Sequence, residues 1–214
     1  MTAYRTVVLD VDSTVSAIEG IDWLASRRDA VVAETVAALT TAAMEARVPI
    51  DDVYGRRLEI IRPTRDEIRE LADVYIATAL PGAREAVRTW RANGIQVVLV
   101  SGGLRDAILP LAAWLGLPDT DVHAVDVEYS SAVAAQVRIP SPLAMRGGKA
   151  TVVASLRLAR PLLAVGDGAT DAELVDVVDR FLAFTGVVRR EAVVEKADGE
   201  VLCFADLTSI VLGT

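Results

Sequence analysis

Two acidic residues directly follow a short apolar run near the start of the sequence. The run, residues 6–9, reads Thr-Val-Val-Leu, and Asp10 and Asp12 come next with one valine between them. A short, β-branched run of this kind is typical of a buried strand. Carboxylates at the end of a buried strand are unfavourable unless a cation compensates them. Ligands bind at the carboxyl ends of strands in open α/β sheets, so the pair predicts a reactive, cation-binding site.

Short strand-like runs alternate with helical patterns along most of the chain. Further strands are expected at residues 95–100, 122–127, 162–165 and 181–184. Helical patterns separate them at residues 83–92, 104–115, 149–158 and 171–177. This alternation is typical of βαβ units, so we expect an α/β fold with a mostly parallel sheet.

One long stretch interrupts the alternation. Residues 16–80 contain no convincing strand and are typical of several helices rich in Ala, Glu and Arg. Thr64 and Glu67 have the spacing of a capping box at the start of one of these helices. We therefore expect residues 16–80 to form a helical cap subdomain, inserted into a core made of residues 1–15 and 81–214.

Composition narrows the class of protein. The net charge of the 214 residues is −8, which disfavours binding to nucleic acid or to a membrane surface. No apolar run approaches the ~18 residues of a transmembrane helix, and the N-terminus lacks a signal-peptide pattern. The single cysteine, Cys203, excludes an intramolecular disulfide and fits a reducing compartment. We expect a cytoplasmic monomer or homodimer.

Three further polar clusters are expected at the same edge of the sheet as the acidic pair. They are Ser101-Gly102-Gly103, Gly147-Gly148-Lys149 and Gly166-Asp167-Gly168-Ala169-Thr170-Asp171. Each cluster alone is compatible with an ordinary turn, helix cap or surface residue. Because parallel strands bring their carboxyl ends to one edge, the clusters together favour a single functional site.

These residue types fit the transfer of a phosphoryl group. A phosphate ester is anionic, so a carboxylate can attack it only where positive charge masks the repulsion. Mg²⁺ suits this role because it prefers hard oxygen ligands and substrate phosphate. Asp10 and Asp167 would bind the metal, with Asp171 close enough to help. Lys149 would add a compact positive charge.

The remaining motif residues fit phosphate binding and proton transfer. Ser101 and the backbone N–H groups of Gly102 and Gly103 would meet the phosphate at a helix N-terminus. One of Asp10 and Asp12 would attack the phosphorus and become an aspartyl phosphate. The other would protonate the leaving oxygen and then activate water, a role worth ~10²–10⁴-fold. The residue types alone do not say which acid does which.

As a set, the four motifs resemble those of the haloacid dehalogenase superfamily of phosphatases. Within it, the chain is most similar to the phosphoserine phosphatases. That finer resemblance rests on Asp10-Val-Asp-Ser-Thr-Val, Glu19-Gly-Ile-Asp, Arg57-Leu and Gly166-Asp-Gly-Ala-Thr-Asp. The resemblance implies a Rossmann-like, three-layer core with a helical cap inserted after the first motif.

The resemblance also implies a role for each motif residue. Asp10 would be the nucleophile, and Asp12 would be the acid/base that also offers its backbone carbonyl to Mg²⁺. Asp167 would complete the protein ligands, and Asp171 would hold a water on the metal. Thr170 would lie near the phosphate.

Three residues of the expected cap would select the substrate. By resemblance, Glu19 would meet a substrate ammonium and Arg57 its carboxylate, while Met44 would line the site. Phosphoserine presents both charges, and arginine binds carboxylates bidentately. The simpler interpretations are a helix N-terminal acid for Glu19 and a solvated helix face for Arg57.

The segment after Met44 departs from the pattern of the resemblance. Glu45 stands where a small glycine is expected, and Ile50 stands where the family has Phe. A carboxylate at position 45 would repel a substrate carboxylate unless Arg47 or solvent offsets it. Alternatively, Glu45 points outward and leaves the substrate unaffected.

These observations predict an Mg²⁺-dependent phosphomonoesterase. The resemblance implies that it hydrolyses L-phosphoserine to L-serine and phosphate, within serine biosynthesis. A phosphatase for another small amino- or hydroxy-acid phosphate is the main alternative. A third hypothesis is a non-catalytic phosphate-binding or phospho-acceptor protein. Asp12, Lys149 and Asp171 argue against this third hypothesis, because a mere acceptor needs no acid/base partner and no substrate-enclosing cap.

Overall fold

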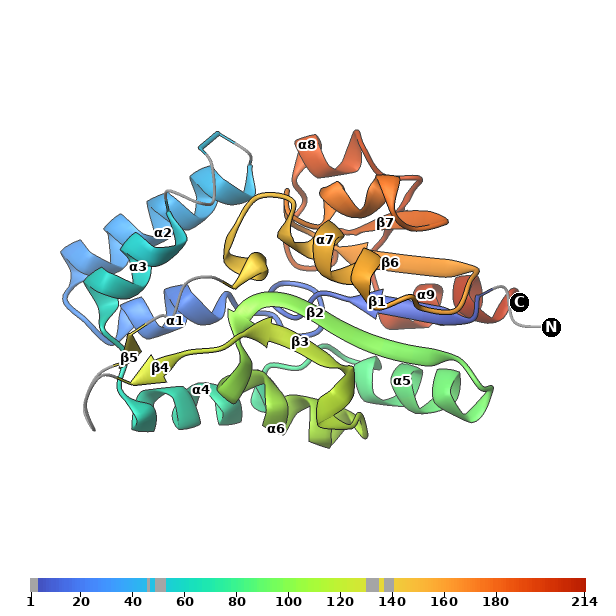
Figure 1. Cartoon of the computed structure of the whole chain (residues 1–214), viewed down its shortest axis with the longest axis horizontal. Coiled ribbons are helices and arrows are strands. Elements are labelled where there is room, and N and C mark those ends of the chain that lie inside the picture. The colour runs from blue at the N-terminus through green and yellow to red at the C-terminus, as the bar shows by residue number, and fades with distance from the viewer. Residues whose placement is uncertain (1–3, 46, 49–52, 130–134, 137–140) are drawn as a thin grey trace.

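The computed structural model describes residues 4–45, 47–48, 53–129, 135–136 and 141–214, and its centre is one parallel sheet (Figure 1). The described strands of this sheet lie in the order β3-β2-β1-β6-β7-β8, and every neighbouring pair is parallel. They are β1 (Thr6–Leu9), β2 (Gln96–Leu104), β3 (Val122–Val125), β6 (Leu162–Gly166), β7 (Arg180–Phe184) and β8 (Glu200–Val201). A separate small hairpin pairs β4 (Glu128–Tyr129) with β5 (Ala135–Gln136).

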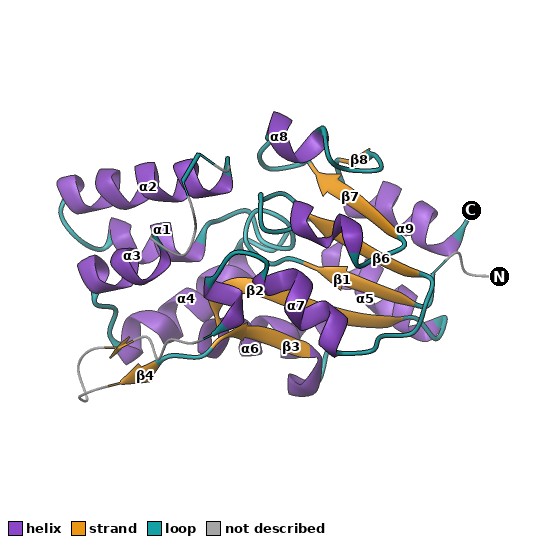
Figure 2. Ribbon diagram, turned by 45° about the horizontal axis from the view of Figure 1, so that its top comes forward, coloured by secondary structure: helices purple, strands orange, loops and turns teal. Residues whose placement is uncertain are grey.

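Helices cover both faces of the sheet, as Figure 2 shows. One face carries α5 (Ala83–Ala92), α6 (Arg105–Leu115) and α9 (Phe204–Leu212), and the other carries α7 (Gly148–Ser155). The short helix α8 (Glu191–Val194) follows β7. All four residues of β1 are buried, as expected for a central parallel strand covered on both sides. The predicted α/β fold with its three-layer core is confirmed.

Some boundaries differ from those that the sequence predicts. β2 continues to Leu104 instead of ending at residue 100, because Leu104 still pairs with Val125 across an irregularity in the register. The apolar pattern stops earlier, since the next three residues are Ser-Gly-Gly. The helix expected at residues 171–177 is a 3₁₀ segment, Ala172–Asp176. The short strand β8 and the helices α8 and α9 were not predicted.

The described residues between β1 and α5, where a helical cap is expected, form four α-helices. They are α1 (Gly20–Ser26), α2 (Ala30–Met44), α3 (Tyr54–Ile61) and α4 (Arg65–Ala77). In Figure 1, α1–α3 form a group beside the sheet edge, while α4 lies along α6 and packs against it. Among the described residues, no helix combines the length and apolarity of a membrane span.

The two chain segments that connect these helices to the sheet run side by side. The Ala17 N–H donates to the Thr78 carbonyl, and the Leu80 N–H donates to the Val15 carbonyl, each at 2.9 Å. This pairing supports the predicted division of the chain near residues 16 and 80. The division itself stays a prediction.

The predicted capping box at the start of α4 is present. The Glu67 N–H donates to Thr64 Oγ1 (3.2 Å), and the Thr64 N–H donates to Glu67 Oε2 (2.8 Å). Arg28, just after α1, donates to both carboxylate oxygens of Glu67 at 2.5 and 2.8 Å. The bidentate ion pair lowers the pKa of Glu67 to about 2. Glu67 therefore ties the end of α1 to the start of α4.

Replacing Glu67 by Gln tests this tie. A carboxylate whose pKa is lowered on folding stabilises the protein above its usual pKa of 4.5, and this contribution fades as the pH falls towards 2. We expect Glu67→Gln to lower the free energy of unfolding by about 1–2 kcal/mol at pH 7, and by less at pH 3.5.

Urea unfolding at both pH values measures the difference. Glu70→Gln is the matched control on the same helix, because its ion pair with Arg27 is half exposed (45% and 51%). Such a pair is worth under ~1 kcal/mol. Equal losses in the two variants, or a loss for Glu67→Gln that does not change with pH, would contradict the interpretation.

Candidate active site

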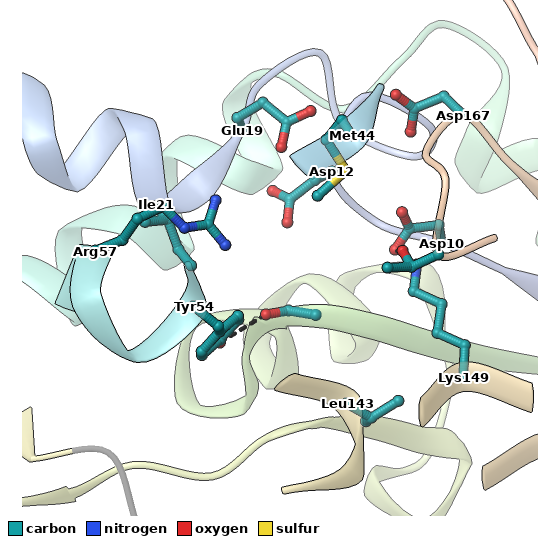
Figure 3. Close-up of a pocket in the computed structure, with 12 residues that line it drawn as sticks. Asp10, Asp12, Glu19, Ile21, Met44, Tyr54, Arg57, Leu143, Lys149 and Asp167 are labelled. Atoms are coloured by element: carbon teal, nitrogen blue, oxygen red, sulfur yellow. Dashed lines mark hydrogen bonds and ion pairs between the residues drawn. The ribbon is translucent and has the colours of Figure 1, made fainter. Parts of the chain in front are cut away.

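The predicted site residues meet at the carboxyl end of β1, which lies between β2 and β6. From β1 the chain proceeds to β2 and β3 on one side, and then crosses to β6, β7 and β8 on the other. Open α/β sheets bind ligands at such a reversal of strand order. A pocket at this edge is drawn in Figure 3. Its lining comprises Asp10, Asp12, Glu19, Ile21, Met44, Tyr54, Arg57, Gly102, Leu143, Lys149, Asp167 and Thr170. The sequence did not indicate Ile21, Tyr54 and Leu143.

Lys149 is buried between two acids of different motifs. Its Nζ lies 2.9 Å from Asp10 Oδ1 and 2.5 Å from Asp171 Oδ1. Burial opposes the charge of the ammonium, but the two carboxylates outweigh it and raise the pKa of Lys149. The simpler interpretation of Lys149 as a solvated surface lysine is therefore wrong, since the side chain is only 3% exposed.

Three carboxylates form a cluster that fits a hard metal ion. Oxygens of Asp10, Asp167 and Asp171 lie within 4.8 Å of one another, and all three residues are buried. Burial, and then the charge of Asp10, raise the pKa of Asp171 to about 7, although Lys149 opposes the shift. Asp10 Oδ1 accepts no hydrogen bond of ordinary geometry, despite the nearby ammonium. An under-satisfied oxygen in an all-oxygen cluster fits Mg²⁺.

Asp12 differs from Asp10 in its partners and in its pKa. Its Oδ1 accepts hydrogen bonds from the Gly20 N–H and the Tyr75 hydroxyl, both at 2.7 Å. Burial, followed by the charges of Glu19 and Asp10, raises the pKa of Asp12 to about 8. A carboxyl that keeps its proton near neutral pH can act as a general acid.

Arg190 joins the site although nothing in the sequence indicated it. Its guanidinium pairs with Asp167 through Nη1, and Nη2 lies 3.3 Å from Glu19 Oε1. Ser13 also donates to Glu19 Oε1, at 2.8 Å. Glu19 is at the N-cap position of α1, but its side chain makes no capping hydrogen bond and lines the pocket instead. The neighbouring Arg189 pairs with other surface residues, so local sequence does not distinguish the two arginines.

Arg57 is buried and faces the pocket from α3 (Figure 3). Its Nη1 donates to Thr40 Oγ1 (2.8 Å), which donates in turn to Asp22 Oδ1 (2.5 Å). The guanidinium carbon lies 5.4 Å from the centre of the Tyr54 ring. Nε has no hydrogen-bond partner. The alternative of a solvated helix face is therefore wrong for Arg57, whose fixed guanidinium can accept an anion.

The Ser-Gly-Gly motif lies at the end of β2. Ser101 is buried and its Oγ accepts the Gly103 N–H at 3.0 Å, while only Gly102 of the three lines the pocket. We expected these N–H groups in the first turn of a helix, but α6 begins only at Arg105. The reason is that β2 continues to Leu104, which still pairs with Val125 beyond an irregularity in the register. The Tyr54 hydroxyl donates to the Gly102 carbonyl at 2.7 Å (Figure 3).

The segment around Met44 closes the pocket over the last motif. The Met44 carbonyl accepts the Ala169 N–H at 3.2 Å, and Thr170 lines the same pocket. Glu45 pairs with Arg47 at 2.6 Å, is 44% exposed and is absent from the pocket lining. The outward orientation, one of the two expected, is thus the one observed. Ile50 lies outside the described residues.

Comparison with known proteins identifies the family. A family model described as haloacid dehalogenase-like hydrolase matches residues 7–176. The chain therefore belongs to the haloacid dehalogenase-like hydrolases, and the predicted superfamily and hydrolase class are confirmed. It is 36% identical to the chloroplastic phosphoserine phosphatase of Arabidopsis thaliana, over 95% of this chain and 70% of that protein. It is 35% identical to the phosphoserine phosphatase of Rattus norvegicus, over 94% and 90%.

Solved structures share the fold. A phosphoserine phosphohydrolase-like protein from Francisella tularensis superposes with a TM-score of 0.89 at 23% identity, covering 97% of this chain and 99% of that one. A substrate-bound phosphoserine phosphatase complex superposes with a TM-score of 0.80 at 23% identity, covering 97% and 98%. These likenesses confirm the α/β fold.

Replacing Lys149 by Met tests how far the buried acids depend on it. Removing one partner of a buried ion pair leaves the other uncompensated, which destabilises proteins by about 3–5 kcal/mol. We expect that loss for Lys149→Met in urea unfolding at pH 7.5 without divalent cations. The control is Lys196→Met, since Lys196 is exposed and the chain has no third lysine. Similar stability of the two variants would contradict this account.

Proposed function

We propose that this protein is an Mg²⁺-dependent phosphomonoesterase that hydrolyses L-phosphoserine through an aspartyl phosphate on Asp10. Phosphatase activity is supported by the family and by the names of the curated relatives. The observation that carries the mechanism is the contrast between two neighbouring acids. Asp10 lies beside the Lys149 ammonium, whereas Asp12 has its pKa raised to about 8. One acid is thus suited to attack and the other to carry a proton.

The acid cluster would hold the metal. Asp10, Asp167 and Asp171 would hold Mg²⁺, Asp171 through a water, together with the backbone carbonyl of Asp12. When bound, Mg²⁺ supplies positive charge that masks the repulsion between carboxylate and phosphate oxygens. Lys149 adds a fixed positive charge, with its Nζ 2.9 Å from Asp10 Oδ1.

The reaction proceeds in two displacements. In the first, a carboxylate oxygen of Asp10 forms a bond to phosphorus and the bond from phosphorus to the ester oxygen breaks. The bonding pair goes to the leaving oxygen, which takes the proton of Asp12. In the second, Asp12 accepts a proton from water, whose oxygen bonds to phosphorus while the Asp10–phosphorus bond breaks. Both carboxyl groups are thereby restored.

The phosphate group would be held by residues from three motifs. Ser101, with the N–H groups of Gly102 and Gly103, would bind its oxygens at the end of β2. Lys149 and Thr170 would also bind them. That Gly102, Lys149 and Thr170 all line the same pocket supports these roles.

The charges of the pocket favour a small metabolite with a carboxylate. Arg57 would bind that carboxylate, Glu19 would bind an ammonium, and Met44 would contact the substrate body. The outward orientation of Glu45 removes the expected repulsion. One observation favours the alternative of a hydroxy-acid phosphate. Glu19 already pairs with Arg190, so its negative charge is partly compensated without a substrate ammonium.

Loss of the nucleophile or of the metal tests the mechanism. We expect Asp10→Asn to lower kcat by more than about a thousandfold, because the amide cannot form the phosphoenzyme. Treatment of the wild-type protein with EDTA should abolish phosphate release, and Mg²⁺ should restore it. Asp206→Asn, an exposed residue of α9, serves as the control. Turnover that survives EDTA, or undiminished turnover in Asp10→Asn, would refute the mechanism.

Substrates that differ by one charged group test the specificity. Phosphoethanolamine lacks the carboxylate, so we expect wild-type KM to be at least about tenfold higher for it than for L-phosphoserine. Arg57→Gln should raise KM for L-phosphoserine by about 10–100-fold and leave phosphoethanolamine almost unaffected. Arg56→Gln, on the exposed side of the same helix, is the control.

Two outcomes of these assays would change the proposal. Equal performance of phosphoethanolamine and L-phosphoserine in the wild-type protein would disprove the role of Arg57. Preference for 3-phosphoglycerate over L-phosphoserine would establish the hydroxy-acid alternative.

A further inference from the structure

Tyr75 reaches the proposed acid/base from a helix that carries none of the sequence motifs. It belongs to α4, its side chain is fully buried, and its hydroxyl donates to Asp12 Oδ1 at 2.7 Å. The other donor to this oxygen is the Gly20 N–H at the start of α1, also at 2.7 Å. Both donors therefore belong to helices between β1 and α5, whereas Asp12 itself lies in the segment that directly follows β1.

The local backbone leaves space for this hydroxyl. A Cβ atom on Gly20 would lie 2.0 Å from the Tyr75 hydroxyl oxygen, so any side chain there would displace it. A Cβ atom on Gly103 would lie 3.2 Å from the same oxygen and 3.2 Å from Asp12 Oδ2. The second carboxyl oxygen of Asp12 therefore lies beside the Ser-Gly-Gly motif, while the first is held by two donors.

We infer that Tyr75 is a positioning residue, which fixes one oxygen of Asp12 so that the other is aimed at the leaving group. The inference rests on the proposed function. With Oδ1 held by Tyr75 and Gly20, Asp12 presents Oδ2 towards the phosphate-binding strand. The proton passes from Oδ2 to the ester oxygen as the bond from that oxygen to phosphorus breaks, and Oδ2 recovers a proton from water in the second step. Tyr75 itself gives up no proton and touches no reacting atom.

This arrangement makes proton transfer depend on the placement of α4. α4 packs along α6 and is joined to the sheet by the segment that pairs with residues 15–17. A shift of α4 away from β1 would withdraw the hydroxyl from Asp12. The attacking group, Asp10, has no such contact with α4, since its ammonium partner belongs to α7.

Removing the hydroxyl while keeping the ring isolates its role. We expect Tyr75→Phe to lower kcat for L-phosphoserine about tenfold while KM stays within twofold, as for the loss of one hydrogen bond to a charged group. The alkoxide leaving group of phosphoserine requires protonation, whereas p-nitrophenolate leaves without it. With enzyme in excess, the first-turnover rate of p-nitrophenol release from p-nitrophenyl phosphate should therefore stay within twofold of wild type.

Two further variants complete the test. Tyr4→Phe removes a hydroxyl that lies 3.5 Å from Arg180, away from the site, and should leave both substrates unaffected. Gly20→Ala keeps the Tyr75 hydroxyl but displaces it, and should reproduce the selective loss with L-phosphoserine. Gly20→Ala thus tests the inference even where Tyr75→Phe does not fold.

The outcomes separate the inference from the function on which it rests. A selective loss with L-phosphoserine supports the positioning role. Equal losses on both substrates would indicate general damage to the site and would overturn it, as would an unchanged kcat for L-phosphoserine. A wild-type protein that releases phosphate from neither substrate would instead disprove the proposed function.

Discussion

The contacts of Lys149 with Asp10 and Asp171 are the interaction on which the rest of the site depends. Three acids at the ends of β1 and β6 lie within 4.8 Å of one another in the protein interior. Among the residues that the structure describes, Lys149 and Arg190 are the cations paired with these acids, and the pKa of Asp171 is still raised to about 7. A divalent cation would reverse this imbalance. Without a cation, the carboxylates would repel an anionic phosphate. With a divalent cation bound, the same cluster would attract it.

Under the proposed function, the helices between β1 and α5 would contribute to the chemistry as well as to enclosure. The Tyr54 hydroxyl donates to the Gly102 carbonyl of β2, and the Tyr75 hydroxyl donates to the carboxyl of Asp12. Each contact joins an inserted helix to a different motif of the core. An enclosed site would limit the access of bulk water during the proposed reaction, and the same contacts would orient the groups that act inside it. Ser16 forms β-bridges with both Asp12 and Ala79, so the two chain segments that connect these helices to the sheet are held together.

The sequence sufficed for elements that repeat a simple pattern. α5 has the bounds that its apolar periodicity predicts, and β1 is found at residues 6–9, because buried periodic segments have few alternatives. Asp10 and Asp167 were predictable because they directly follow such strands. Tyr75 and Arg190 were not, since each reaches the site across a long sequence separation. Tyr75 resembles any apolar residue on the buried face of α4, and only the folded backbone brings its hydroxyl to Asp12.

The proposed recognition of a substrate carboxylate by Arg57 and of an ammonium by Glu19 would differ in its physical basis. Arg57 is buried and its Nε has no partner, and a buried polar group left unpaired is destabilising by about 1–3 kcal/mol. Its Nη1 is held by Thr40, so the guanidinium cannot turn away to find another acceptor. Glu19, in contrast, already has Ser13 and Arg190 as partners. Under the proposed function, an ammonium would compete with these partners for Glu19, so a carboxylate bound by Arg57 would be the stronger determinant of selection.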